Sequence, residues 1–75
     1  MAISRQEFFL PDGVRLERLP IVLARTGLSR STIYKKISEG TFPHPVKLGE
    51  RAVAWDAAAV TAWISDRVAA NDPAV

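Results

Sequence analysis

Three aliphatic hydroxyl groups and three cations crowd into the eight-residue stretch "SRSTIYKK", which runs from Ser29 to Lys36. These groups donate hydrogen bonds and supply positive charge, so they suit the binding of phosphate oxygens. An enzyme would instead need a nucleophile or an acid placed beside a base. The single histidine, His44, has no evident Asp or Ser partner in the sequence, the carboxylates are scattered, and no phosphate-cradling glycine loop is present. We therefore expect a binding protein with neither enzymatic activity nor a cofactor.

The apolar residues of this stretch predict a helix with one free face. Ile33 and Ile37 are about one turn apart, so they form the buried stripe of a helix over residues 30–39. At about 100° per residue, Ser31 and Lys35 then point away from the core. The free face is short, hydroxyl-bearing and cationic, and such a helix fits a DNA major groove about 12 Å wide.

A glycine turn joins this helix to the one before it. The sequence "PIVLARTG" predicts a helix that begins at Pro20, where a missing N–H costs nothing, and ends at Gly27 in a left-handed conformation. Ser29 suits the N-cap of the next helix, because its hydroxyl can accept a hydrogen bond from a free N–H of the first turn. Two short helices joined by a tight glycine turn are typical of a helix-turn-helix.

The segment that follows the second helix predicts a β-hairpin. Pro43 and Pro45 exclude a helix and favour extended backbone. The stretches "VKL" and "RAVAW" are short apolar alternations on either side of Gly49 and Glu50. This pattern predicts a two-residue turn with Gly49 at a positive φ.

Such a turn would also fix the register of the hairpin. Leu48 would lie opposite Arg51, and Val46 would lie opposite Val53. Lys47 would point away from the apolar face of the hairpin, and Arg51 would lie at its tip. The apolar face would cover the helices with four side chains, which are Val46, Leu48, Val53 and Trp55.

The remaining segments predict a first strand and a last helix. The alternation in "VRLERL" predicts a short strand near residues 14–19 with a helix following it. Asp56 is suited to cap the last helix, and both tryptophans are expected to pack in the core. The apolar stripe of the last helix has four members at helical spacing, which are Val60, Trp63, Ile64 and Val68.

Length and composition set the domain organisation. With 75 residues, the chain has room for one small domain. We place it at residues 14–70, between a flexible N-terminal arm over 1–13, which carries "FFL", and a frayed tail over 71–75. The absence of cysteine and the lone histidine exclude disulfides and a structural zinc site. The N-terminal segment has no long apolar run, so we expect a soluble cytoplasmic protein with no membrane partner.

The positive charge is concentrated in the middle of the chain. Residues 25–51 contain six cations and two carboxylates, a net charge of +4, whereas the rest of the chain has four cations and six carboxylates. This asymmetry favours a polyanion as the partner, although a mildly basic solvated surface would show the same count. A protein-interaction module that uses "FFL" and Trp63 as anchors, without DNA binding, is an alternative of another class.

Three stretches, "TGLSRSTIY", "GTFPHPVKLGERAVAW" and "VTAWI", together resemble the AlpA-type prophage regulators, a family related to phage excisionases and to the DNA-binding part of MerR proteins. The resemblance covers about residues 15–67. It implies a mainly α fold with a small β-hairpin, that is, a winged helix-turn-helix that binds double-stranded DNA in the bacterial nucleoid. Carried over by position, the recognition helix begins at Ser29 and Arg30, and the wing carries Lys47 and Arg51.

We therefore expect the second helix to enter the major groove and the wing to contact the DNA backbone or the adjacent minor groove. The predicted DNA-binding residues are Ser29, Arg30, Ser31, Thr32, Tyr34, Lys35, Lys36, Lys47 and Arg51. A phage-type transcriptional regulator is the main hypothesis, and an excisionase that binds and bends attachment-site DNA is the alternative. Self-association or tandem binding on DNA is expected in both, with an integrase or RNA polymerase as a further partner.

Overall fold

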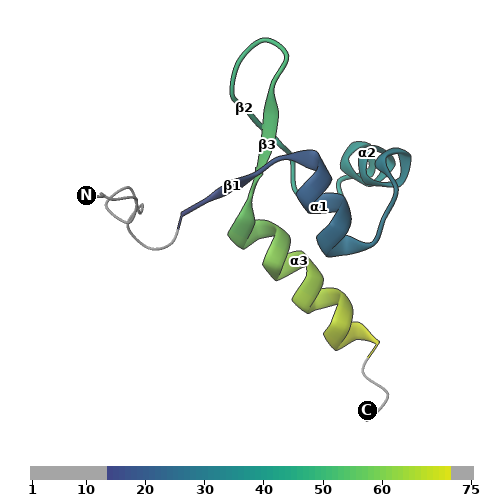
Figure 1. Cartoon of the computed structure of the whole chain (residues 1–75). Coiled ribbons are helices and arrows are strands. Elements are labelled where there is room, and N and C mark those ends of the chain that lie inside the picture. The colour runs from purple at the N-terminus through teal and green to yellow at the C-terminus, as the bar shows by residue number, and fades with distance from the viewer. Residues whose placement is uncertain (1–13, 72–75) are drawn as a thin grey trace, which may run out of the picture.

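A computed structural model describes residues 14–71 of the chain, so the predictions for the N-terminal arm and most of the tail concern residues outside the described range. The elements are β1 (Leu16–Glu17), α1 (Leu19–Thr26), α2 (Arg30–Glu39), β2 (Val46–Lys47), β3 (Val53–Asp56) and α3 (Ala57–Ala70). Three helices lie on one side of a small antiparallel sheet with strand order β1-β3-β2, and the β2–β3 hairpin projects beyond the helices (Figure 1). This arrangement confirms the predicted mainly α, winged helix-turn-helix fold. Within residues 14–71, no helix combines the length and the apolar character needed to cross a membrane.

The helix α2 begins and ends where the capping residues predict, whereas α1 ends as predicted but begins at Leu19, one residue before Pro20. Gly27 has a φ of 74°, and its N–H donates to the carbonyl oxygen of Leu23. The Ser29 hydroxyl accepts a hydrogen bond of 3.2 Å from the Thr32 N–H and so caps α2. Gly40 ends α2 at a φ of 80°, a conformation that residues with a Cβ rarely adopt.

The hairpin differs from the prediction by one residue in its register. Val46 pairs with Ala54 and Lys47 pairs with Val53. The N–H groups of Leu48 and Gly49 both donate to the Ala52 carbonyl oxygen, so the loop has three residues, 49–51. The predicted two-residue turn is therefore wrong. So is the positive φ of Gly49, because Gly27 and Gly40 are the glycines with positive φ among residues 14–71.

This shift changes which side chains of β2 face the helices. A slip of one residue moves every side chain of a strand to the other face of its sheet. Val53 and Trp55 face the helices as predicted, but the residue opposite Val53 is Lys47. Val46 and Leu48 lie on the outer face and are 43% and 48% exposed. The apolar face predicted for β2 is therefore wrong, and so is the outward orientation of Lys47.

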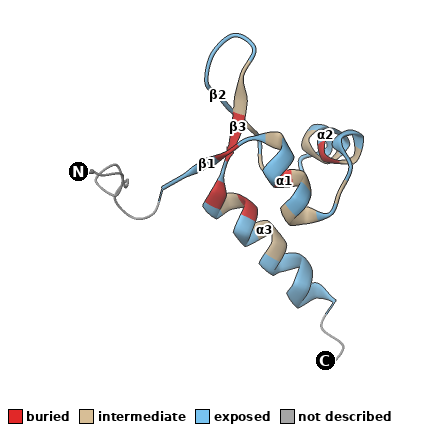
Figure 2. Ribbon diagram, viewed as in Figure 1, coloured by how far each residue is buried: buried red, intermediate tan, exposed pale blue. Residues whose placement is uncertain are grey.

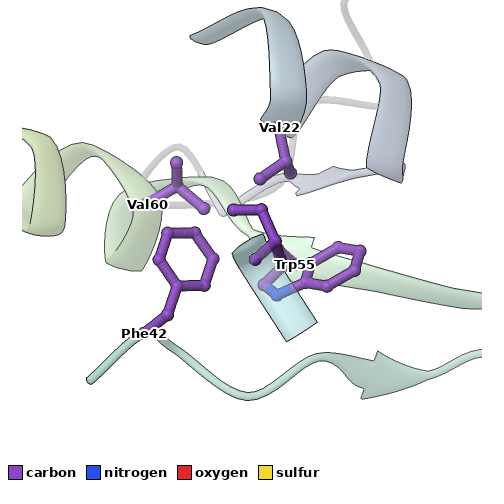
Figure 3. Close-up of a cluster of buried hydrophobic side chains, with 5 residues drawn as sticks. Val22, Phe42, Trp55 and Val60 are labelled. Carbon is purple, nitrogen blue, oxygen red and sulfur yellow. The ribbon is translucent and has the colours of Figure 1, made fainter. Parts of the chain in front are cut away.

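The core lies where the sheet meets the three helices. Five buried side chains form it, which are Val22, Ile33, Phe42, Trp55 and Val60 (Figures 2 and 3). The indole N–H of Trp55 donates to the Pro43 carbonyl oxygen and that of Trp63 donates to the Thr41 carbonyl oxygen. Both tryptophans thus belong to the core or its edge, as predicted. Both also form a hydrogen bond with the segment that connects α2 to β2. Val68 is 66% exposed, so it does not belong to the buried stripe predicted for α3.

Candidate nucleic-acid interface

The orientation of α2 agrees with the prediction. Ile33 is fully buried and Ile37 is half-buried against the core. Ser31 and Lys35, on the opposite side of the helix, are exposed. The face that α2 turns outward therefore carries the hydroxyl and ammonium groups identified from the sequence.

Not every predicted site residue lies on that face. The hydroxyls of Ser29 and Thr32 are hydrogen-bonded to each other at 2.9 Å, and both belong to the N-cap of α2. Lys36 is half-buried and lies on the flank of α2 opposite to Tyr34. Lys35 is exposed, with its Nζ 3.9 Å from Glu39 Oε2, a surface ion pair of the weak kind.

An open cleft lies between the start of α1, the exposed flank of α2 and the hairpin loop. Three arginines from these three elements line it, namely Arg18, Arg30 and Arg51. Within residues 14–71, none of the three has a carboxylate within ion-pairing distance, although Glu50 also lines the cleft. The structure thus brings the predicted Arg30 and Arg51 together and adds a third cation to them.

Tyr34 also lines this cleft and connects it to the core. The Arg30 guanidinium lies 5.6 Å from the centroid of the Tyr34 ring, a cation–π distance. The other contact of the ring is with the buried Trp55, edge to face, at a centroid distance of 6.2 Å. Ser31, Arg30 and Tyr34 also line a shallow hollow beside the cleft. The Arg30 guanidinium therefore lies beside the Tyr34 ring, which itself contacts the core.

Arg18 is a cleft residue that the sequence analysis did not identify. It is the N-cap of α1 and has an extended backbone and no side-chain capping bond. The first turns of α1 and α2 contain no acidic residue. Because helix N-termini carry partial positive charge, a cation at this position is unfavourable unless an anion lies nearby. The combination of an arginine at the helix start with no acidic residue after it is the signal that could have revealed Arg18.

The wing supplies the remaining cations. Lys47 is exposed and lies on the face of the sheet that also carries Val53 and Trp55, which is the side of the helices. Arg51 is exposed in the loop of the hairpin, in agreement with its predicted position. The register correction thus places Lys47 on the same side of the wing as α2.

Arg25 contributes to the charge count but does not lie on this surface. It donates a 2.6 Å hydrogen bond to Glu17 and another hydrogen bond to the Thr61 hydroxyl, so it joins β1, α1 and α3. Glu17 also accepts a hydrogen bond from Arg15 and is 6% exposed. Burial on its own would raise the pKa of the Glu17 carboxyl, but the hydrogen bonds and charges of Arg25 and Arg15 together outweigh burial and lower this pKa below its usual value. The carboxylate therefore stays ionised and acts as a structural partner.

No metal-binding chemistry accompanies this surface in residues 14–71, where no three His, Asp or Glu side chains gather around one point. The arrangement is a cationic surface made by a helix face, a helix start and a hairpin loop. It can bind an extended anion by hydrogen bonds and charge.

Comparison with known proteins places the chain in a family. The sequence model of the family described as "Prophage CP4-57 regulatory protein (AlpA)" matches residues 15–68, which include every element of the fold except the last two residues of α3. The chain belongs to the AlpA family. Residues 15–68 take in α2, the wing and the whole arginine cleft, so this surface is part of the AlpA-family domain.

Two curated relatives of this AlpA-family chain are similar over most of their length. The DNA-binding transcriptional activator AlpA of Escherichia coli (strain K12) is 38% identical over 62 residues, which cover 75% of this chain and 89% of the relative. A protein of Enterobacteria phage P4, named "Uncharacterized protein ORF88", is 51% identical over 62 residues, which cover 80% of this chain and 70% of the relative.

Proposed function

We propose that this AlpA-family chain is a sequence-specific double-stranded-DNA-binding protein that acts as a phage-type transcriptional regulator without enzymatic activity. The observation that carries the proposal is the cleft in which Arg18, Arg30 and Arg51 meet beside the exposed face of α2. The E. coli relative is named as a DNA-binding transcriptional activator, which agrees with this proposal.

The cleft has the chemistry of a phosphate-binding track. Arginine binds phosphate oxygens through a planar fork of N–H donors, and the bonds are strengthened by charge. Within residues 14–71, no carboxylate neutralises the three guanidinium groups at ion-pairing distance. A DNA strand that runs between α2 and the wing would therefore place its backbone over this cleft, with Lys47 on the same side of the wing.

The outward face of α2 has the chemistry for reading bases. In helix-turn-helix proteins, the N-terminal residues of the second helix reach base edges in the major groove. Arg30 and Ser31 occupy that end of α2 and are exposed, and Lys35 follows one turn later. Arginine and lysine donate hydrogen bonds to guanine O6 and N7, and serine can form hydrogen bonds with several bases. We assign contacts with base edges and nearby phosphates to these three residues, and backbone contact to Tyr34 and the wing.

The remaining predicted residues take supporting roles in this proposal. Ser29 and Thr32 hold the start of α2 in place, and their N–H groups lie at its positive end, where a phosphate oxygen is favoured. Lys36, on the half-buried flank of α2, reaches a phosphate at the edge of the groove.

The salt dependence of DNA binding tests the proposal. Each neutralised phosphate lowers the logarithm of the binding constant by about 0.9 per unit of log[salt], so about four contacts give a slope near −3.5. The measurement is a gel shift with an operator fragment over a range of salt concentrations, with a scrambled duplex of the same length as the control. Binding that ignores salt, or that is equal for both duplexes, would contradict the proposal.

Such a small interface binds weakly by itself, so we propose that several copies associate or bind in tandem on DNA and add avidity. Tight binding of a lone monomer to one short half-site would argue against this part of the proposal.

Genome-wide mapping of binding sites distinguishes a transcriptional regulator from an excisionase. Sites at promoters support a transcriptional regulator that meets RNA polymerase, whereas sites at attachment DNA beside an integrase gene support an excisionase.

A further inference from the structure

The shallow hollow beside the arginine cleft lies in the N-terminal half of α2. Arg30, Ser31 and Tyr34 line it. Residues three and four apart in a helix are neighbours on one face, so Tyr34 lies next to both Ser31 and Arg30. The Tyr34 ring is the largest apolar group of the three, and this residue is 38% exposed. The hollow therefore combines an accessible aromatic ring with a guanidinium and a hydroxyl group.

The hollow and the arginine cleft share two of their residues. Arg30 and Tyr34 line both, so the hollow continues the cleft toward the exposed side of α2. The Tyr34 ring already contacts the buried Trp55, edge to face, at a centroid distance of 6.2 Å. The part of the ring that stays accessible therefore faces the surface that we assign to DNA.

We propose that this hollow binds the 5-methyl group of a thymine in the major groove, an inference that rests on the proposed function. Among the groups that the four base pairs present in the major groove, the thymine methyl is the apolar one, and alanine or phenylalanine side chains recognise it by contact. The Tyr34 ring offers such a contact. Its hydroxyl keeps the backbone contact assigned to it, because tyrosine has an apolar ring with a polar end.

The position of the hollow also restricts which thymine is bound. The Arg30 guanidinium lies 5.6 Å from the centroid of the Tyr34 ring. Successive bases of a strand are about 3.4 Å apart along the duplex axis, so groups that touch these two side chains lie at most about two base pairs apart. We therefore expect this thymine within two base pairs of the position at which Arg30→Ala relaxes the sequence preference.

Replacement of thymine by uracil tests the proposal, because uracil lacks only the 5-methyl group. The probe is the operator fragment of the salt series with each thymine replaced in turn, in a gel shift with the full chain. We expect one replacement to weaken binding about fourfold, which corresponds to about 0.8 kcal/mol, the value of one buried methyl group. Tyr34→Ala should bind the thymine and uracil fragments equally. Lys35→Ala, on the same helix but outside the hollow, is the matched control and should keep the fourfold difference.

Nuclear magnetic resonance of the complex gives a readout that needs no variant, which matters because Tyr34 packs on Trp55. We expect nuclear Overhauser contacts between the Tyr34 ring protons and the methyl group of this thymine in the unmodified complex. The methyl signal should also shift upfield on binding.

Two results would overturn the proposal. One is equal binding of the thymine and uracil fragments at every position. The other is a uracil effect that persists in folded Tyr34→Ala, with no contact between the ring and a thymine methyl group in the unmodified complex. The proposed function survives both results if the operator still binds more tightly than the scrambled duplex. Equal binding of the operator and the scrambled duplex would instead overturn the proposed function, and this inference with it.

Discussion

Two groups of arginines in this small domain have opposite surroundings. Arg25, with Arg15, surrounds the buried carboxylate of Glu17 and ties β1 to α1 and α3. Arg18, Arg30 and Arg51 come from three elements as well, but they line an open cleft without a carboxylate at ion-pairing distance in residues 14–71. The same side chain thus stabilises the fold in one region and, within residues 14–71, has no ion-pair partner in the other. A count of charges along the sequence does not distinguish these roles, because the role depends on where the partner carboxylate lies.

The largest effect that separates the two groups is expected from Arg25→Ala. This variant leaves the Glu17 carboxylate buried with Arg15 as its remaining partner, so we expect the free energy of unfolding to fall by about 2 kcal/mol. Urea unfolding followed by circular dichroism measures it. Arg18→Ala is the matched control and should not lower the unfolding midpoint. Equal destabilisation by both variants would break the distinction between the groups.

In the cleft, the expected loss is in DNA affinity and not in stability. Arg30→Ala and Arg51→Ala each remove one charged contact, and we expect about a tenfold weaker binding constant, which corresponds to about 1.4 kcal/mol. Loss of a phosphate contact should also make the salt slope shallower by about 0.9. Gel shifts over a salt series, with Arg67→Ala as a control on the exposed part of α3, measure both quantities. Unchanged affinity in both cleft variants would remove the cleft from the DNA-binding surface.

Acid should weaken the fold through the Glu17 network. The pKa of Glu17 is lower in the folded chain than its unfolded value of about 4.3. Its stabilisation is therefore fully present above that unfolded value and is lost as the pH falls through the folded pKa. Glu17→Gln removes this contribution, so its unfolding free energy should depend less on pH in the acid range. Parallel curves for the two proteins would show that Glu17 does not contribute to the acid response.

The smallest effect is expected at Lys35 on the outward face of α2. Lys35→Ala removes an exposed cation and a surface ion pair with Glu39 that is worth about 0.3–0.5 kcal/mol in a helix. We expect DNA binding to weaken a few-fold while the circular dichroism spectrum stays the same. Loss of the folded state in this variant would contradict the orientation of α2.

The parts of the fold that were predictable are those set by neighbouring residues. The bounds of α2 follow from Ser29 and Gly40, and the turn before it follows from Gly27, because capping and left-handed glycine act within one or two turns of chain. The hairpin register was not predictable in this way. Gly49 and Glu50 fit a two-residue turn, but the pairing of β3 with both β1 and β2, together with the burial of Trp55, decides which residues face the helices.

The candidate site also has a part that local sequence predicts and a part that depends on tertiary packing. The exposure of Ser31 and Lys35 follows from the spacing of Ile33 and Ile37 within one helix. The meeting of Arg18 with Arg30 and Arg51 depends on how α1, α2 and the hairpin pack together, and no local pattern contains that information. The position of Arg25 away from the arginine cleft also depends on tertiary packing, because its partner Glu17 lies in β1.

The edge-to-face contact between Tyr34 and Trp55 gives the domain a built-in optical reporter. Trp55 is fully buried, yet its indole is one aromatic ring away from the cleft in which Arg30 lies. A phosphate group that shifts Arg30 or Tyr34 would change the electric field at the indole, and with it the wavelength and yield of its fluorescence. Occupancy of the cleft can therefore be followed by emission from the unlabelled protein, with Trp63→Phe used to remove the signal of the second indole.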